Sequence, residues 1–112
     1  MISKTKITLV VPAQLQNELR LRVAKDGYGL RGKSKWVSEA VQSLLIMNDF
    51  AKLVHYSEEL HGFEKVETIV ITTVLKQALD NAIVTTRQQF PTLEGVQSAI
   101  IRTAIMQRLL RG

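Results

Sequence analysis

The chain of 112 residues contains no cysteine, and only 5% of its residues are aromatic. The lack of cysteine excludes disulfides, thiolate metal sites and a cysteine nucleophile, and it fits a reducing cytoplasm. No apolar run approaches the roughly 20 residues that a membrane helix needs, so we expect a cytoplasmic protein without a membrane partner. The N-terminal residues alternate in polarity instead of forming an apolar block, so we expect no signal peptide.

Hydrophobic residues make up 46% of the chain. This fraction is sufficient for a packed core and argues against disorder. Because aromatic residues are scarce, the core must be built mainly from aliphatic side chains. The chain length suits one compact domain or two very small intertwined units.

The excess of positive charge lies in one half of the chain, whose overall net charge is +5. Residues 1–47 contain eight basic and three acidic side chains, whereas residues 48–112 contain seven of each. Such an asymmetry is typical of a protein that binds nucleic acid or an anionic surface. A soluble protein with unevenly distributed surface charge is the alternative.

The first half of the chain predicts a strand followed by two helices. Residues 6–11 alternate with a period of two and predict a half-buried strand that Pro12 ends. Apolar residues four apart then predict an amphipathic helix, which Gly27 and Gly29 terminate. Its stripe consists of Leu15, Leu19 and Val23. Ser34 is the expected N-cap of the second helix, whose buried face consists of Val37, Ala40, Val41, Leu44 and Leu45.

The second half repeats this order. The β-branched run of residues 66–71 predicts a strand, and the stripe of the first helix recurs 60 residues later as Leu75, Leu79 and Ile83. The pattern of the second helix recurs 64 residues later as Ser98, Ile101, Ala104, Ile105 and Leu109. The offset between the copies is 60 residues in the first helix and 64 in the second. This difference predicts an insertion of four residues between the two helices, around Thr85 to Glu94. Thr92 is an alternative N-cap for the last helix.

The segment between the two copies predicts a helical connector. Asp49 is its expected cap and Gly62 its expected end, and its apolar residues are Phe50, Leu53, Val54 and Leu60. The expected organisation is a first repeat in residues 1–47, a connector in residues 48–64 and a second repeat in residues 65–112. We expect the two repeats to form one intertwined domain.

A single strand with two helices leaves backbone groups unpaired and buries little apolar surface. Two such units solve both problems when their strands pair antiparallel and their four helices cover the common apolar face. The expected fold class is therefore mainly α with a short antiparallel two-stranded β-ribbon. The connector is long enough for a ribbon within one chain, and an exchanged ribbon between two chains is equally open.

Three segments, Lys6–Pro12, Ser34–Val41 and Ser98–Ile105, resemble the ribbon-helix-helix family of Arc/MetJ-type DNA-binding proteins. The resemblance covers about 45 residues in each half, and the tandem order is similar to that of the TraY-type accessory proteins of conjugative plasmids. It implies a tandem ribbon-helix-helix fold with double-stranded DNA as the partner. It also implies self-association as an intramolecular pseudo-dimer, further oligomers on DNA, and proteins of conjugation or transcription as other partners.

The same resemblance implies that the outward residues of the first strand, Lys6, Thr8 and Val10, meet base edges in the major groove. Their chemistry agrees, because lysine can donate to guanine, threonine can hydrogen-bond either way and valine can pack on a thymine methyl. An ordinary solvated strand face is the alternative.

The outward residues of the second strand are expected to be Val66, Thr68 and Val70, none of which is basic. We therefore expect the two strands to read DNA asymmetrically. Glu67 falls on the core face of this strand, and we expect it to lie beyond the paired region and to reach solvent.

Phosphate contacts are expected where a helix begins, because its free N–H groups and partial positive charge attract anions. The family contacts phosphate with the start of its second helix, and the matching residues in this sequence are Lys33, Ser34 and Lys35, with Ser98 in the second copy. Lys4 is a further phosphate candidate beside the first strand. Loop solubility is the alternative explanation for Lys33 and Lys35.

Two other patterns suggest different chemistry. Residues 27–34 match the nucleotide-binding pattern G-x-x-x-x-G-K-[ST], but that motif requires a preceding strand and here a helix is expected instead. His55 and His61, with Glu58 and Glu59, form either a metal cluster or, as we expect, ordinary surface residues. The sequence contains no nucleophile–base arrangement, so we expect no enzyme, no metal and no cofactor.

The expected function is sequence-specific DNA binding as a transcriptional regulator, in particular a repressor. A conjugation accessory role would use the same contacts. A protein-interaction module, similar to antitoxins of the same fold, is the alternative from another class. A phosphate-binding protein should lose affinity steeply as salt rises, and this distinguishes the classes.

Overall fold

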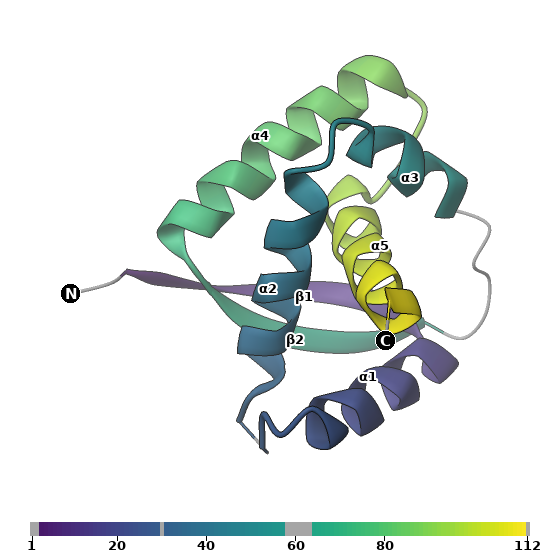
Figure 1. Cartoon of the computed structure of the whole chain (residues 1–112). Helices are drawn as coiled ribbons and strands as arrows, with labels where there is room; N and C mark the ends of the chain where they lie inside the picture. Colours follow the sequence, from purple (N-terminus) through teal and green to yellow (C-terminus); the bar gives the residue numbers. More distant parts are fainter. Residues whose placement is uncertain (1–2, 30, 58–63, 112) are drawn as a thin grey trace.

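The computed structural model describes residues 3–29, 31–57 and 64–111. In chain order, the elements are β1 (Lys4–Pro12), α1 (Ala13–Lys25), α2 (Lys33–Leu45), α3 (Phe50–Tyr56), β2 (Glu64–Thr72), α4 (Thr73–Gln89) and α5 (Val96–Arg111) (Figure 1). The protein is mainly helical, and β1 and β2 form a two-stranded antiparallel sheet. This part of the predicted fold class is confirmed, and both strands belong to the same chain.

The register of the sheet is centred on one pair of equivalent residues of the two sequence copies. β1 and β2 pair from Lys4 opposite Thr72 to Pro12 opposite Glu64, with Thr8 opposite Thr68 at the centre. Since Thr68 follows Thr8 by the 60-residue offset of the repeat, the sheet is arranged almost symmetrically about this pair.

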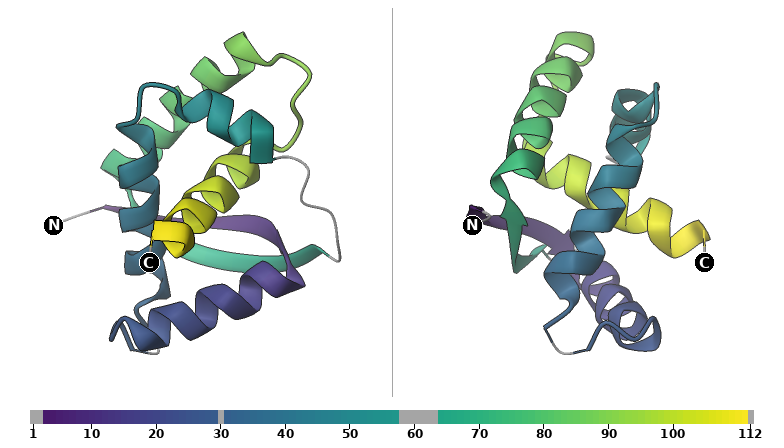
Figure 2. Two further views of the ribbon diagram at one scale, coloured as in Figure 1. Left: turned by 45° about the vertical axis from the view of Figure 1, so that its right-hand side comes forward. Right: turned by 60° about the vertical axis from the view of Figure 1, so that its left-hand side comes forward.

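The helices lie against the sheet as a layer of two central and two flanking helices. α2 and α5 cross the sheet, whereas α1 and α4 lie along its two sides (Figures 1 and 2). The alternation predicted for the strands is confirmed, because the inward Ile7, Leu9 and Ile69 are buried while Lys6, Thr8 and Thr68 are exposed.

A mainly aliphatic core forms between the sheet and the helices. Its largest fully buried side chains include Leu9, Leu19, Trp36, Leu44, Ile69, Leu79, Ile100, Ile101 and Ile105. Burial of one such side chain stabilises the fold by about 1.5–3 kcal/mol. The predicted stripes of all four long helices contribute to this core, although Leu45, Ile83 and Leu109 are only partly buried. Trp36 is the largest of these fully buried side chains and is 0% exposed.

The first helices of the two copies differ in length. α1 contains 13 residues and α4 contains 17. The difference matches the four-residue insertion predicted around Thr85 to Glu94, which takes the form of an extra helical turn. Positive φ angles at Gly27 (81°) and Gly29 (76°) follow α1, as the sequence predicts, because glycine adopts this conformation without steric cost.

The predicted N-caps of the second helices are wrong. α2 begins at Lys33 with Gly32 as its N-cap, so Ser34 is already inside the helix. The preceding loop is tight, and a Cβ at Gly32 would lie 2.1 Å from the Tyr28 carbonyl oxygen, so a residue without a side chain is required there. α5 begins at Val96, after Gly95 with a φ of 58°, so neither Thr92 nor Ser98 caps it.

The connector contains α3, which buries Ala51 and Val54 and begins after Asp49, as predicted. The Asp49 side chain forms no capping hydrogen bond, and α3 ends at Tyr56, so the predicted helix end at Gly62 is wrong. Leu60 and Gly62 lie outside the described residues. Within the ranges that the structure describes, no helix has both the length and the apolar character to cross a bilayer.

Candidate nucleic-acid interface

The sheet face that points away from the core carries seven of the residues predicted to contact DNA. We call this surface the ribbon face, and it consists of Lys4, Lys6, Thr8, Val10, Val66, Thr68 and Val70. Val10 is partly buried and the other six are exposed. Val66 is 63% and Val70 39% exposed, which is unusual for valine in a compact protein and shows that no other part of the described chain covers this face.

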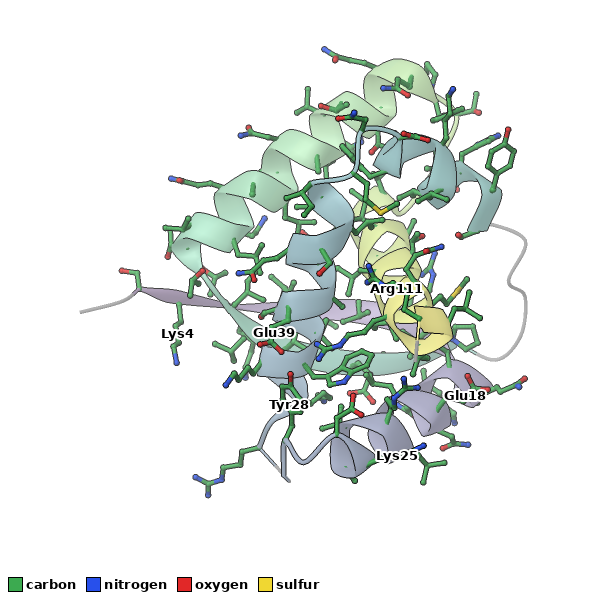
Figure 3. All side chains as sticks on the ribbon, in the orientation of Figure 1. Lys4, Glu18, Lys25, Tyr28, Glu39 and Arg111 are labelled. Atoms are coloured by element: carbon green, nitrogen blue, oxygen red, sulfur yellow. The ribbon has the colours of Figure 1, made fainter. Side chains whose placement is uncertain are left out.

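The chemistry of the ribbon face changes along its length. Lys6 lies opposite Val70, Thr8 opposite Thr68 and Val10 opposite Val66. Both lysines therefore lie toward one end, the two threonines at the centre and two valines toward the other end. Lys4 lies at the start of β1, at one end of the sheet (Figure 3). The asymmetry predicted between the two strands is thus also an asymmetry between the two ends of the sheet.

Two serines hold the starts of the central helices against the sheet. The Val70 amide donates a hydrogen bond to Ser34 Oγ at 2.9 Å, and the Val10 amide donates one to Ser98 Oγ at 3.3 Å. The two serines are equivalent in the two copies, and each one binds the strand of the other copy. A hydroxyl that accepts one hydrogen bond can still donate another, so both remain able to bind an oxygen ligand.

The two helix starts differ in charge. At the start of α2, Lys35 is exposed and its amine lies 5.9 Å from the centre of the Tyr28 ring. At the start of α5, the matching residue is the buried Ala99. Arg102, one turn into α5, donates from Nη1 to the Val10 carbonyl oxygen at 2.8 Å. The helix start with the exposed Lys35 lies beside Val70, and thus at the lysine end of the ribbon face.

Lys33 does not lie on the ribbon face. Its amine is 2.5 Å from Glu67 Oε2, and its side chain is 30% exposed. Glu67 also accepts hydrogen bonds from Gln16 Nε2 at 2.8 Å and from Arg20 Nη2 at 3.2 Å. α1, α2 and β2 therefore meet at one carboxylate behind the sheet.

The prediction that Glu67 reaches solvent is wrong, because the residue is 3% exposed. β2 is paired as far as Glu64, so Glu67 lies within the sheet, opposite Leu9 and on its covered side. Burial alone raises the pKa of this carboxyl, but hydrogen bonds from Lys33 and Gln16 and the charges of Lys33 and Arg20 outweigh it and lower the pKa below its ordinary value.

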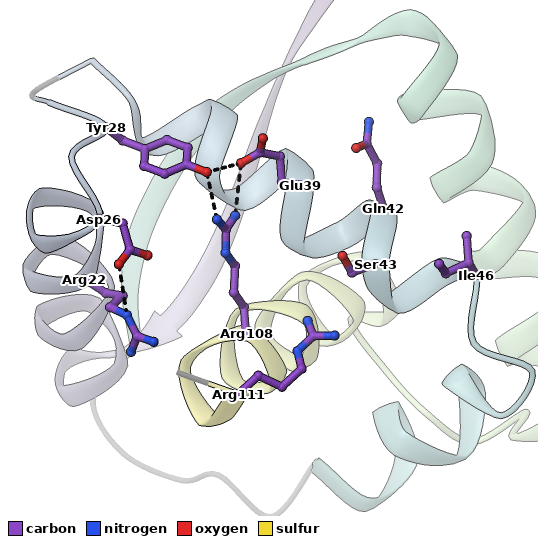
Figure 4. Close-up of a pocket in the computed structure, with 9 residues that line it drawn as sticks. All are labelled: Arg22, Asp26, Tyr28, Glu39, Gln42, Ser43, Ile46, Arg108 and Arg111. Carbon is purple, nitrogen blue, oxygen red and sulfur yellow. Dashed lines mark hydrogen bonds and ion pairs between the residues drawn. The ribbon is translucent and has the colours of Figure 1, made fainter.

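A second polar cluster lies where α2, α5 and the loop after α1 meet. It borders an open groove of about 650 Å³ between α1, α2 and α5 (Figure 4). Arg108 Nη2 donates to Tyr28 Oη at 2.8 Å and Nη1 to the Trp36 carbonyl oxygen at 2.7 Å, while the guanidinium lies 4.4 Å from the centre of the Trp36 ring. Glu39 accepts from both Tyr28 and Arg108. The cluster thus joins the C-terminal half of α5 to α2 and to the loop after α1.

These contacts also lower the pKa of two carboxyls. The hydrogen bond from Tyr28 is the main cause at Glu39, with Arg108 adding to it. The hydrogen bond from Trp36 Nε1, at 2.9 Å, is the main cause at Asp26. The partners in both clusters were not predicted from the sequence. The one signal present was Glu67 itself, since an acidic residue on a core face requires cationic or hydrogen-bonding partners.

The remaining candidate sites have other surroundings. The loop that matches the nucleotide-binding pattern follows α1 and not a strand, and its Lys33 and Ser34 are bound to Glu67 and Val70. His55 stacks on Phe90 with ring centroids 4.2 Å apart. Glu58, Glu59 and His61 lie outside the described residues. No group of three or more metal-ligating side chains occurs in the described part of the chain.

Comparison of the chain with protein-family models, with curated proteins and with solved structures gives no match. Functional inference therefore depends on the geometry of the ribbon face and on the two helix starts that flank it.

Proposed function

We propose that this protein is a tandem ribbon-helix-helix protein that binds double-stranded DNA sequence-specifically, with its β-ribbon in the major groove. The observation that carries the proposal is an exposed ribbon face with Lys6 and Thr8, flanked at its ends by the starts of two helices. A two-stranded ribbon matches the width of the major groove of B-DNA. The symmetric register of the ribbon supports the tandem arrangement.

In this proposal, the ribbon face supplies the base contacts. Lys6 donates to guanine O6 and N7, and the central Thr8 and Thr68 hydrogen-bond to base edges. Val10, Val66 and Val70 pack against thymine methyl groups. Because both lysines lie toward one end of the ribbon face and Val10 and Val66 toward the other, the preferred site is not a palindrome and the protein binds it in one orientation.

Phosphate contacts would hold the ribbon in register. The starts of α2 and α5 present free N–H groups and a partial positive charge beside the two ends of the ribbon. Ser34 and Ser98 are anchored at these points, and Lys35 and Lys4 add positive charge toward one end. The biological role that we propose is transcriptional repression, because a small protein that occupies a promoter sequence blocks access to it.

A selection from random duplexes tests this proposal. We expect Lys6→Ala to cost about 1–3 kcal/mol in binding and to relax the preference at one base position, because a base contact is lost. Thr8→Ala should relax a neighbouring position. Lys52→Ala is the matched control, since Lys52 is an exposed lysine on α3, away from the ribbon.

Three results would be informative. An equal loss for all duplexes with Lys6→Ala would make Lys6 a phosphate contact only. An effect of Lys52→Ala as large as that of Lys6→Ala would show that overall charge, and not the ribbon face, binds DNA. Failure of the unaltered protein to bind any duplex at low salt would exclude the proposed function.

A further inference from the structure

Lys33 and Lys35 lie two residues apart at the start of α2, yet their surroundings differ. The amine of Lys33 forms an ion pair with Glu67 and its side chain is 30% exposed. Lys35 is exposed, and its amine has the Tyr28 ring as its neighbour at 5.9 Å. The two lysines carry the same charge, but an approaching anion meets Lys33 already paired with a carboxylate and Lys35 exposed.

The position of Glu67 is special to the second copy. Its equivalent in the first copy, 60 residues earlier, is Ile7, which is a buried core residue. The Glu67 carboxylate accepts hydrogen bonds from Gln16 and Arg20 of α1 and from Lys33 of α2. Arg20 is 62% exposed, so Lys33 is the more enclosed of the two cations that neutralise this carboxylate.

We propose that Glu67 is a positioning residue that withdraws Lys33 from the DNA-binding surface and leaves Lys35 as the cation presented by the start of α2. This inference rests on the proposed function. A phosphate that recruited Lys33 would leave a carboxylate buried with weaker compensation, which is unfavourable. Glu67 thus limits the sequence-independent attraction to DNA and raises the relative weight of the base contacts on the ribbon face.

The salt dependence of binding to a duplex measures this effect directly, because each phosphate contact by a cation contributes about 0.9 to the slope of log K against log[salt]. We expect Lys35→Gln to reduce the slope by about 0.9 and Lys33→Gln to leave it unchanged. Glu67→Gln should release Lys33, increase the slope by about 0.9 and tighten binding about eight-fold at 0.1 M salt. Addition of Lys33→Gln to Glu67→Gln should return the slope to its original value.

Equal reductions of the slope by Lys33→Gln and Lys35→Gln would overturn the proposal, since Lys33 would then be a phosphate contact. This comparison does not require Glu67→Gln to fold. Circular dichroism of each variant separates a change in the binding surface from unfolding.

A second measurement needs neither a variant nor DNA. Limited acetylation of the unaltered protein, followed by mass spectrometry, should modify Lys33 several-fold more slowly than Lys35. Equal rates would show that Glu67 does not withdraw Lys33. If the protein binds no duplex, both the proposed function and the role of Glu67 in DNA binding are wrong. The acetylation rates still decide whether the ion pair between Lys33 and Glu67 forms in solution.

Discussion

The two copies of the strand-helix-helix pattern agree in their apolar residues and differ in their charged and bulky ones. Leu19 and Leu79 are both buried, and so are Val37 and Ile101. By contrast, Ile7 corresponds to Glu67 and Trp36 corresponds to Ile100. The comparison shows that most core positions keep the apolar periodicity, whereas single positions differ in chemistry, and that one of these, Glu67, lies on the core face itself.

Glu67 and Trp36 each contact charged side chains of the other half of the chain. Glu67 in the second half is neutralised by Lys33 and Arg20 in the first half. Trp36 in the first half packs against Arg108 in the second half. Since every such pair joins the two halves, the asymmetry of the surface and the stability of the fold depend on the same contacts.

The largest effect on stability is expected when Ile7 and Glu67 are each replaced by the residue type of the matching position in the other copy. Ile7→Glu should reduce the free energy of unfolding by about 3–5 kcal/mol, because it buries a carboxylate where the counterpart of Arg20 is the acidic Asp80. The counterpart of Gln16 is Lys76, but this lysine is already paired with Asp80. Urea denaturation measures this loss, and addition of Asp80→Arg should restore part of it. Glu67→Ile should cost less, because a buried ion pair can often be replaced by an apolar residue. A greater loss for Glu67→Ile than for Ile7→Glu would contradict this explanation.

The two serines that bind the strands provide a smaller contrast. The bond to Ser34 is shorter, but the Val70 amide is exposed and can be hydrated, whereas the Val10 amide is partly buried. We therefore expect Ser98→Ala to cost about 1–2 kcal/mol and Ser34→Ala about 0.5–1 kcal/mol in urea denaturation. Ser43→Ala on α2 is the control, with a change within about 0.5 kcal/mol. The opposite order would mean that bond length, and not burial, determines the contribution.

A lysine added to the second strand should make the two ends of the ribbon face more alike. Val66 corresponds to Lys6 and is 63% exposed, so Val66→Lys should not disturb folding. We expect the salt slope of DNA binding to rise by about 0.9 and the selected sequence to become more symmetric. Val84→Lys, at a 56% exposed position on α4, should change neither. Equal effects of both variants would argue against the ribbon face as the binding surface.

The smallest effect is expected on thermal stability when the pH is lowered. The pKa of Glu67, Glu39 and Asp26 is lowered in the folded protein. A lowered pKa means that these carboxylates stabilise the fold fully above their ordinary values, near 4–4.5, and lose this contribution as the pH falls through their folded values. Melting temperatures measured from pH 7 downward should therefore fall below about pH 4.5, and Glu67→Gln should weaken this dependence. A melting temperature that rises on acidification would contradict these assignments.

Much of the candidate site was predictable because it depends on local periodicity. Alternation in residues 6–11 predicted which side chains of β1 face outward. Alternation with Ile69 and Ile71 inward predicted the same for Val66, Thr68 and Val70. The partners of Lys33 were not predictable. The side chain of a lysine at a helix start can extend toward solvent or toward the core, and only the position of β2 relative to α2 decides between them. The N-cap role predicted for Ser34 was wrong, and its contact with the sheet was not predictable for the same reason, because its strand partner lies 36 residues away.

The sequence by itself determined the order of the strands and helices, the sides they bury and the extra turn of α4, because these follow from periodicities of 2 and 3.6 residues and from glycine and proline positions. The tertiary structure decided the register that puts Lys4 and Lys6 toward one end, the ion pair that holds Lys33, and the stacking of Arg108 on Trp36. A periodic pattern specifies which face of an element is apolar, but not which element covers it. Contacts between long polar side chains exist only once packing has brought their elements together.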